Sequence, residues 1–200
     1  MTGQIPDEFI FKGESYSIAG IKGPTLFNPR DYDISPQSAS TACWRGFVAY
    51  YAVLEDRLII DTLFIKCKEP KEINGIEPKD ETSFSPEDEE YAYIKHFFSY
   101  CYPKINLELD FTGSILIGKD FIDEMYVHMG FQRPITFRTV YELTFENGQL
   151  IKTVNKSKEM DKRRLEDSQK GARPRSNDES DIKEWVIDSF SLSYEETDDD

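Results

Sequence analysis

Short runs in which apolar and polar residues alternate dominate the first three-quarters of the chain. In "EFIFKGESYSI", Phe9 and Phe11 share one face, Lys12-Gly13 supplies a turn, and the returning run alternates through Tyr16 and Ile18. Alternation with a period of two is typical of a strand with one buried face. The pattern therefore predicts an opening β-hairpin.

Two further hairpins are predicted. In "TACWRGFVAYYAVLEDRLIIDTLFIKCK", the runs Cys43–Val53 and Leu58–Lys66 flank a polar break at Glu55–Arg57. Both faces of the second run are largely apolar, which indicates a strand covered on two sides. In "ITFRTVYELTFENGQLIKTV", the dipeptide Asn147-Gly148 between alternating runs is a strong turn signal.

Two segments have helical spacing instead. In "SPEDEEYAYIKHFFSYC", Ser85 can cap a helix that begins at Pro86 and runs to about Tyr100. In "DFIDEMYVHMG", Asp120 is a candidate N-cap and Gly130 a candidate left-handed terminator of a short helix. The predicted class is α+β and mainly β, with antiparallel sheets arranged as a sandwich or an open barrel and two short helices.

The composition changes after Asn155. Residues 156–175 contain eight basic and four acidic side chains, whereas 176–200 contain one basic and ten acidic ones. We expect a mainly-β domain over 1–155, a charged flexible linker over 156–183, and an apolar segment with an acidic tail over 184–200. The run "EWVIDSFSLSY" either docks as a closing strand or serves as a ligand for a partner, and the alternation of Ser189–Tyr194 favours docking.

The whole chain carries 24 basic and 38 acidic residues, a net charge of -14. Such a field repels phosphate backbones and anionic lipids, so direct nucleic-acid and membrane binding are not expected, whereas a basic protein partner is favoured. Acidity is also an ordinary route to solubility. The three cysteines form no CxxC pair and no run of eighteen apolar residues occurs, which predicts a cytoplasmic protein without a disulfide framework.

Reactive chemistry has few candidates. Cys43 and His128 are a conceivable nucleophile and base, although a buried cysteine and a histidine near a helix C-terminus need no chemical role. A small enzyme or small-molecule binder would place Cys43, Arg45 and His128 around one cavity, with Glu142 as a further candidate. The acidic runs lack the ligand spacing of a calcium loop, and the sequence predicts neither a metal nor a cofactor.

Binding candidates are more numerous. The guanidinium of Arg45 can fork onto a carboxylate or phosphate while Trp44 anchors apolar contact, although an arginine at a hairpin start usually pairs with an acidic residue of its own chain. The remaining candidates are acidic or aromatic: Glu87, Asp88, Glu89, Glu90, Tyr91, Trp185, Tyr194 and the tail Asp198–Asp200.

The runs "STACWRGF", "INGIEP", "FTGSILIGKDFI", "YVHMGF" and "ELTFENGQLI", which cover much of residues 38–151, resemble uncharacterised bacterial proteins of mainly β character. The resemblance implies a bacterial source and brings no activity with it. Taken with the charge, the sequence favours a non-enzymatic, acidic binding protein of inhibitor or immunity type that docks a basic protein.

Overall fold

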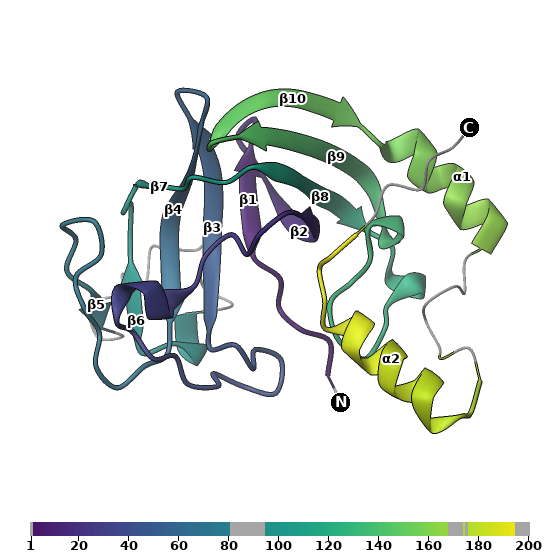
Figure 1. Cartoon of the computed structure of the whole chain (residues 1–200), viewed down its shortest axis with the longest axis horizontal. Coiled ribbons are helices and arrows are strands. Elements are labelled where there is room, and N and C mark those ends of the chain that lie inside the picture. The colour runs from purple at the N-terminus through teal and green to yellow at the C-terminus, as the bar shows by residue number, and fades with distance from the viewer. Residues whose placement is uncertain (1, 81–94, 168–173, 175, 195–200) are drawn as a thin grey trace.

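One curled β-sheet around a hydrophobic core is the main feature of the structure (Figure 1). The structure is a computed structural model that describes residues 2–80, 95–167, 174 and 176–194. Its strands are β1 (Glu8–Phe11), β2 (Glu14–Lys22), β3 (Phe47–Leu54), β4 (Arg57–Ile65), β5 (Lys79–Asp80), β6 (Tyr100–Tyr102), β7 (Leu107–Glu108), β8 (Gly113–Phe121), β9 (Phe137–Glu146) and β10 (Gln149–Asn155). The predicted mainly-β class is confirmed, with a single sheet in place of a sandwich.

The strand order is β10-β9-β8-β2-β1-β3-β4-β6-β5, and β7 also pairs with β4. Neighbouring strands are antiparallel except β1 and β3, which run parallel and make the sheet mixed. At one end β10 returns to β4 through the pair Gln149 and Arg57, and the amide of Leu58 donates to the carbonyl of Gly148 at 2.8 Å. The sheet therefore closes on itself at this end and forms an open barrel.

The inner face of the barrel carries the largest apolar cluster. Phe9, Tyr51, Leu63 and Phe145 are at most 1% exposed and come from four different strands. The prediction that the second strand of the central hairpin is buried on both faces is confirmed, because Phe64 packs outward against Phe98 in a separate cluster. Burial on both faces explains why this strand is apolar almost throughout.

The predicted helix at 120–130 is wrong. Strand β8 continues to Phe121, which pairs with Phe137 of β9, and only a 3-10 turn at Asp123–Met125 follows. The rings of Phe121 and Phe137 also pack at 5.4 Å between centroids. Pairing with β9 thus outweighs the local helical spacing, although Gly130 does adopt the predicted left-handed conformation, with φ 69°.

The helix predicted from Pro86 to about Tyr100 lies mostly outside the described residues, since 81–94 are not described. Its described end is not α-helical: Lys95–Phe97 form a 3-10 turn and Tyr100 begins β6. There Tyr100 pairs with Ile65 of β4. Hydrogen bonding to the edge of β4 therefore decides the conformation of this end.

Helix α1 (Ser157–Asp167) lies where a flexible linker was expected, and α2 (Glu179–Ser189) runs from the end of that predicted linker into the apolar segment 184–200. Both helices lie on the side of the molecule formed by β8 and β9 (Figure 1). Met160 of α1 is 2% exposed against the outer face of the sheet. After α2 the chain is extended, and the carbonyl of Leu192 accepts the amide of Ile21 in β2 at 2.6 Å. Other 3-10 turns are Pro29–Tyr32 and Pro134–Thr136.

Candidate functional site

Arg45 is held by a carboxylate of its own chain. Its two terminal nitrogens donate to the two oxygens of Asp7 at 2.7 and 2.8 Å, and Asp7 also accepts the amide of Ala49 at 2.7 Å. The side chains are 23% and 6% exposed. Burial disfavours the charged form of Arg45, but Asp7, together with Cys43 and Tyr51, outweighs this effect and raises the pKa of Arg45. Arg45 therefore ties the chain before β3 to the residue that precedes β1, and both of its terminal nitrogens already have a carboxylate partner.

Trp44 lies on the outside and packs against the C-terminal segment. Its ring stacks on Phe190 with centroids 4.9 Å apart and an interplanar angle of 10°, and 49% of the residue stays exposed. Trp44, Arg45 and Phe190 line a cavity of about 430 Å³. The contact places the end of α2 beside the loop that precedes β3, an arrangement that sequence reasoning did not foresee.

Cys43 and His128 are not brought together. Cys43 is 1% exposed in the outer cluster with Val48, and its thiol lies 3.4 Å from the carbonyl of Phe47. Burial raises the pKa of the Cys43 thiol. His128 is exposed and packs edge-on against Tyr126, with ring centroids 4.7 Å apart. A sealed thiol with a raised pKa is a poor nucleophile, so this pair has neither the contact nor the access that catalysis requires.

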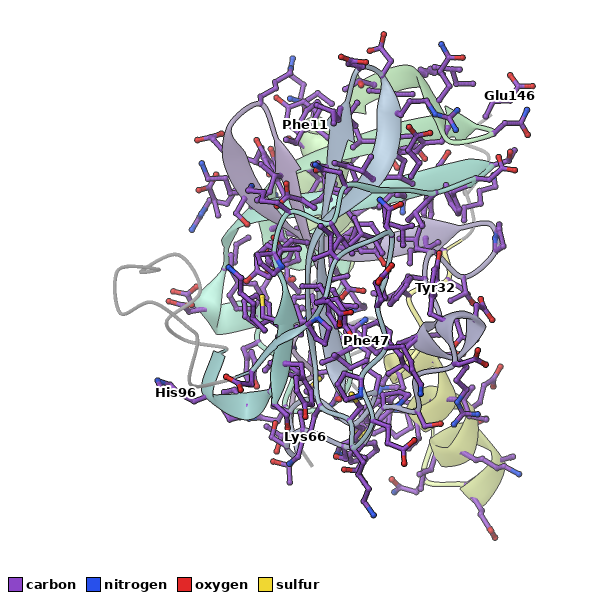
Figure 2. All side chains as sticks on the ribbon, turned by 90° about the vertical axis from the view of Figure 1, so that its left-hand side faces the viewer. Phe11, Tyr32, Phe47, Lys66, His96 and Glu146 are labelled. Carbon is purple, nitrogen blue, oxygen red and sulfur yellow. The ribbon has the colours of Figure 1, made fainter. Side chains whose placement is uncertain are left out.

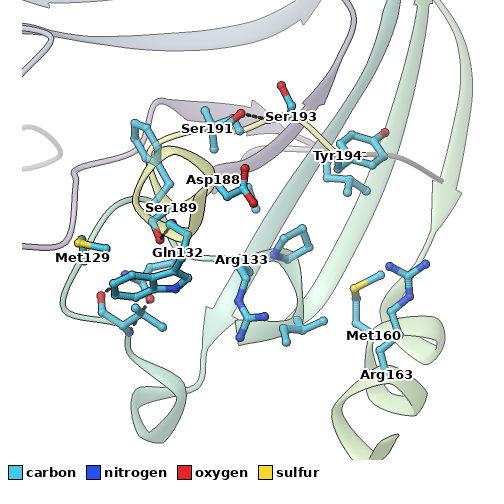
Figure 3. A pocket seen from close by; sticks show the side chains of 18 residues that line it. Met129, Gln132, Arg133, Met160, Arg163, Asp188, Ser189, Ser191, Ser193 and Tyr194 are labelled. Atoms are coloured by element: carbon cyan, nitrogen blue, oxygen red, sulfur yellow. Dashed lines mark hydrogen bonds between the residues drawn. The ribbon is translucent and has the colours of Figure 1, made fainter. Parts of the chain in front are cut away.

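The other predicted binding residues are scattered. Glu87, Asp88, Glu89, Glu90 and Tyr91 lie outside the described residues, as does the tail Asp198–Asp200. Trp185 lies on α2 and lines a cavity of about 640 Å³. Figure 3 shows this cavity between α1, α2 and the loop that carries Arg133, with Arg163, Asp188 and Tyr194 around it.

Tyr194 joins the C-terminal segment to the outer face of β9. Its hydroxyl donates to Glu142 at 2.7 Å, and the ammonium of Lys156 lies 3.7 Å from the other carboxylate oxygen. Glu142 is only 5% exposed. Glu142, which the enzyme alternative would place beside Cys43 and His128, instead binds the hydroxyl of Tyr194 in the C-terminal segment.

Replacing Tyr194 with phenylalanine is expected to lower the free energy of unfolding by about 1.5–3 kcal/mol, because a buried carboxylate loses a hydrogen-bond donor. Urea denaturation of the full chain measures this change. Tyr126→Phe is the matched control, since the Tyr126 hydroxyl makes no hydrogen bond to another described residue, and it is expected to cost less than about 0.5 kcal/mol. Equal costs for the two variants would contradict a stabilising role of the Tyr194–Glu142 contact.

An acidic rim surrounds the closed end of the barrel. We use this name for five exposed carboxylates in three neighbouring segments: Glu55 and Asp56 in the turn between β3 and β4, Glu108 and Asp110 at and after the end of β7, and Glu146 at the end of β9. The segments are joined through their backbones, because Leu150 donates to Asp56, Leu109 donates to Leu58 and Gly148 donates to Phe111 at 2.8 to 3.0 Å. Figure 2 shows Glu146 pointing outward at this end of the molecule.

Arg57 lies within the acidic rim and is engaged there. Its Nε lies 3.4 Å from the carboxylate of Glu108, and another guanidinium nitrogen donates to the carbonyl of Asn147 at 2.6 Å. Leu54 and Ile151 flank the rim and are 51% and 56% exposed. Sequence reasoning used Glu55 and Asp56 only as a turn signal and missed the rim, because its three segments are far apart along the chain.

Comparisons with protein-family models, with curated protein sequences and with solved structures found no match for this chain. The resemblance to bacterial mainly-β proteins therefore stays a prediction. Within 2–80, 95–167, 174 and 176–194, no helix is long and apolar enough to cross a membrane, and no three histidine, cysteine or acidic side chains are grouped to hold a metal ion.

Proposed function

We propose that this chain is a non-enzymatic, acidic binding protein that docks a basic protein partner, in the manner of an inhibitor or immunity protein. The acidic rim carries the proposal. Five exposed carboxylates lie on three backbone segments that meet where the barrel closes, and Leu54 and Ile151 expose apolar area beside them.

The arrangement suits recognition of a protein in three respects. A negative patch speeds encounter with a positive one and disfavours partners of like charge. Exposed leucine and isoleucine side chains supply apolar area that a partner can bury. Hydrogen bonds between these segments fix the backbone that carries the charges before binding, which lowers the ordering cost of association.

Neutralising the acidic rim is expected to slow association. The rim variant Glu55→Gln, Asp56→Asn, Glu108→Gln, Asp110→Asn, Glu146→Gln changes the net charge from -14 to -9, because five negative charges are removed. A control variant removes five exposed carboxylates elsewhere: Asp31, Asp33, Glu69, Glu72 and Glu77. Both variants have the same net charge, so any difference between them reports the position of the charges.

The wild type and both variants are used as bait in a host extract, and the protein retained by wild type and control is identified by mass spectrometry and purified. We expect a basic protein whose association rate falls at least about tenfold between about 50 mM and about 500 mM salt. The rim variant should associate at least about tenfold more slowly than the control. A neutral partner, a rate indifferent to salt, or equal rates for the two variants would contradict the proposal.

A further inference from the structure

A second cavity lies on the outer face of β1, β2 and β3, beneath the N-terminal residues 2–6. Its volume is about 610 Å³, within the range of sites that take small organic molecules. Phe121 and Phe137 close it from the paired ends of β8 and β9, and Tyr126 and Gln132 close it from the loop between these strands. The acidic rim does not contribute to it.

Glu8 is the only charged side chain among the described residues that line this cavity. The hydroxyl of Ser15 donates to one carboxylate oxygen at 3.0 Å, and the hydroxyl of Ser17 donates to the other at 3.2 Å. Both serines line the same cavity, so the carboxylate faces it too. No lysine or arginine of the described part of the chain pairs with Glu8. The carboxylate is therefore held in position without a counter-charge.

The two amide side chains of the cavity are already engaged. Gln4 donates to the carbonyl of Thr41 at 3.0 Å and accepts the amide of Trp44 at 3.1 Å. Gln132 accepts the amide of Val127 at 3.0 Å and donates to the carbonyl of the same residue at 2.8 Å. Glu8 is therefore the one charged acceptor of the described lining, which favours a ligand that donates hydrogen bonds, and the hydroxyl of Tyr126 in the same wall can also accept one.

Aromatic rings make up much of the rest of the wall. Phe121 packs edge-on against Tyr126 at 6.3 Å between centroids and against Phe137 at 5.4 Å, and Tyr50 lines the cavity from β3. The faces of such rings attract cations and their area favours apolar groups. A ligand with a positive charge and an apolar body matches both parts of the wall.

We propose that this cavity binds a small organic primary amine, whose ammonium group donates to Glu8 while its apolar body packs against the aromatic rings. The inference is independent of the acidic rim. The arrangement supplies acceptor oxygens, as water does for an ammonium ion in solution, and adds a compensating negative charge that water lacks.

The direction of the pKa shift of Glu8 agrees with this assignment. Burial raises the pKa of Glu8, and Ser15 and Ser17 oppose the shift only in part. Because this pKa is higher in the folded protein than in an unfolded chain, ionisation of Glu8 costs stability as the pH rises through it. Glu8→Gln is therefore expected to leave the melting temperature at pH 7 unchanged or raised, which makes it a usable test variant.

Calorimetric titration of the full chain with 2-phenylethylamine tests the proposal. We expect a Kd of about 0.1–1 mM for a ligand of this size. The neutral analogue 2-phenylethanol, which keeps the apolar body, should bind at least about tenfold more weakly because it lacks the charge-assisted hydrogen bond. Equal affinity for amine and alcohol, or no heat of binding for the amine up to about 10 mM, would overturn the proposal.

The variants locate the site. Glu8→Gln should weaken amine binding roughly 10- to 100-fold and leave alcohol binding unchanged. The control is Glu14→Gln, since Glu14 is an exposed carboxylate on the neighbouring strand that pairs with Lys119 at 2.6 Å and does not line the cavity. Unchanged amine affinity in Glu8→Gln, or an equal loss in Glu14→Gln, would show that the amine does not bind at Glu8.

Discussion

Replacing Asp7 with alanine is expected to lower the free energy of unfolding by about 3–5 kcal/mol, the cost of breaking a buried ion pair by removal of one partner. Asp7 is 6% exposed and accepts hydrogen bonds from Arg45 at 2.7 and 2.8 Å and from the amide of Ala49 at 2.7 Å. Without it, a guanidinium and a backbone amide are left without their acceptor. Urea denaturation followed by circular dichroism measures the loss.

Two further variants separate the contributions. Asp7→Asn keeps an acceptor for Ala49 but removes the charge, so its cost should fall between wild type and Asp7→Ala. Combining Asp7→Ala with Arg45→Met removes the stranded cation, and the double variant should be less destabilised than the two single costs added. A loss below about 1 kcal/mol in Asp7→Ala would mean that solvent already screens the pair.

Replacing Gly130 with alanine is expected to release α2 from the barrel. An added Cβ would lie 1.8 Å from the carbonyl oxygen of Ser189, the last residue of α2, and Gly130 has φ 69°. That oxygen accepts the amide of Phe131 at 2.7 Å, so the clash also removes a hydrogen bond. An alanine in the left-handed conformation costs about 1–2 kcal/mol, and loss of the hydrogen bond costs about 1 kcal/mol. Both costs favour release of α2 from the barrel.

Hydrogen exchange of the α2 and Phe131 amides measures this effect. A loss of about 2 kcal/mol in docking should speed their exchange roughly 30-fold. Gly75→Ala is the matched control, because Gly75 has φ 75° but nothing within 4 Å of the position of a Cβ. The control has the same backbone strain without the clash. If both variants leave the exchange of α2 alike, Gly130 does not hold this helix.

The features that were predicted correctly are those stabilised by interactions between residues close together in the sequence. The turn at Asn147-Gly148 is observed, with φ 47° and 76°, and the central hairpin turns at Glu55-Asp56, where both residues are left-handed. Turn chemistry and alternation act within a few residues, so a short window contains their causes. The helix predicted at 120–130 failed because the cause of its real conformation is the pairing of Phe121 with Phe137.

The candidate site was less predictable. The sequence indicated both a ligand fork and an internal pair for Arg45, and the structure supplies the internal partner, Asp7. The acidic rim and Glu8 were missed because neither has a local signature. Each depends on turns or strands that lie far apart along the chain.

The sequence by itself determined the mainly-β class, the three hairpins and the strong negative charge, since alternation, turn residues and ionisable groups are local properties. Only the tertiary structure decided that β1 joins β3 in parallel, that β10 returns to β4, and that α1 packs on the sheet where a linker was expected. The physical reason is that these contacts are stabilised by burying surfaces of distant segments against one another, and this free energy does not exist until the chain has folded.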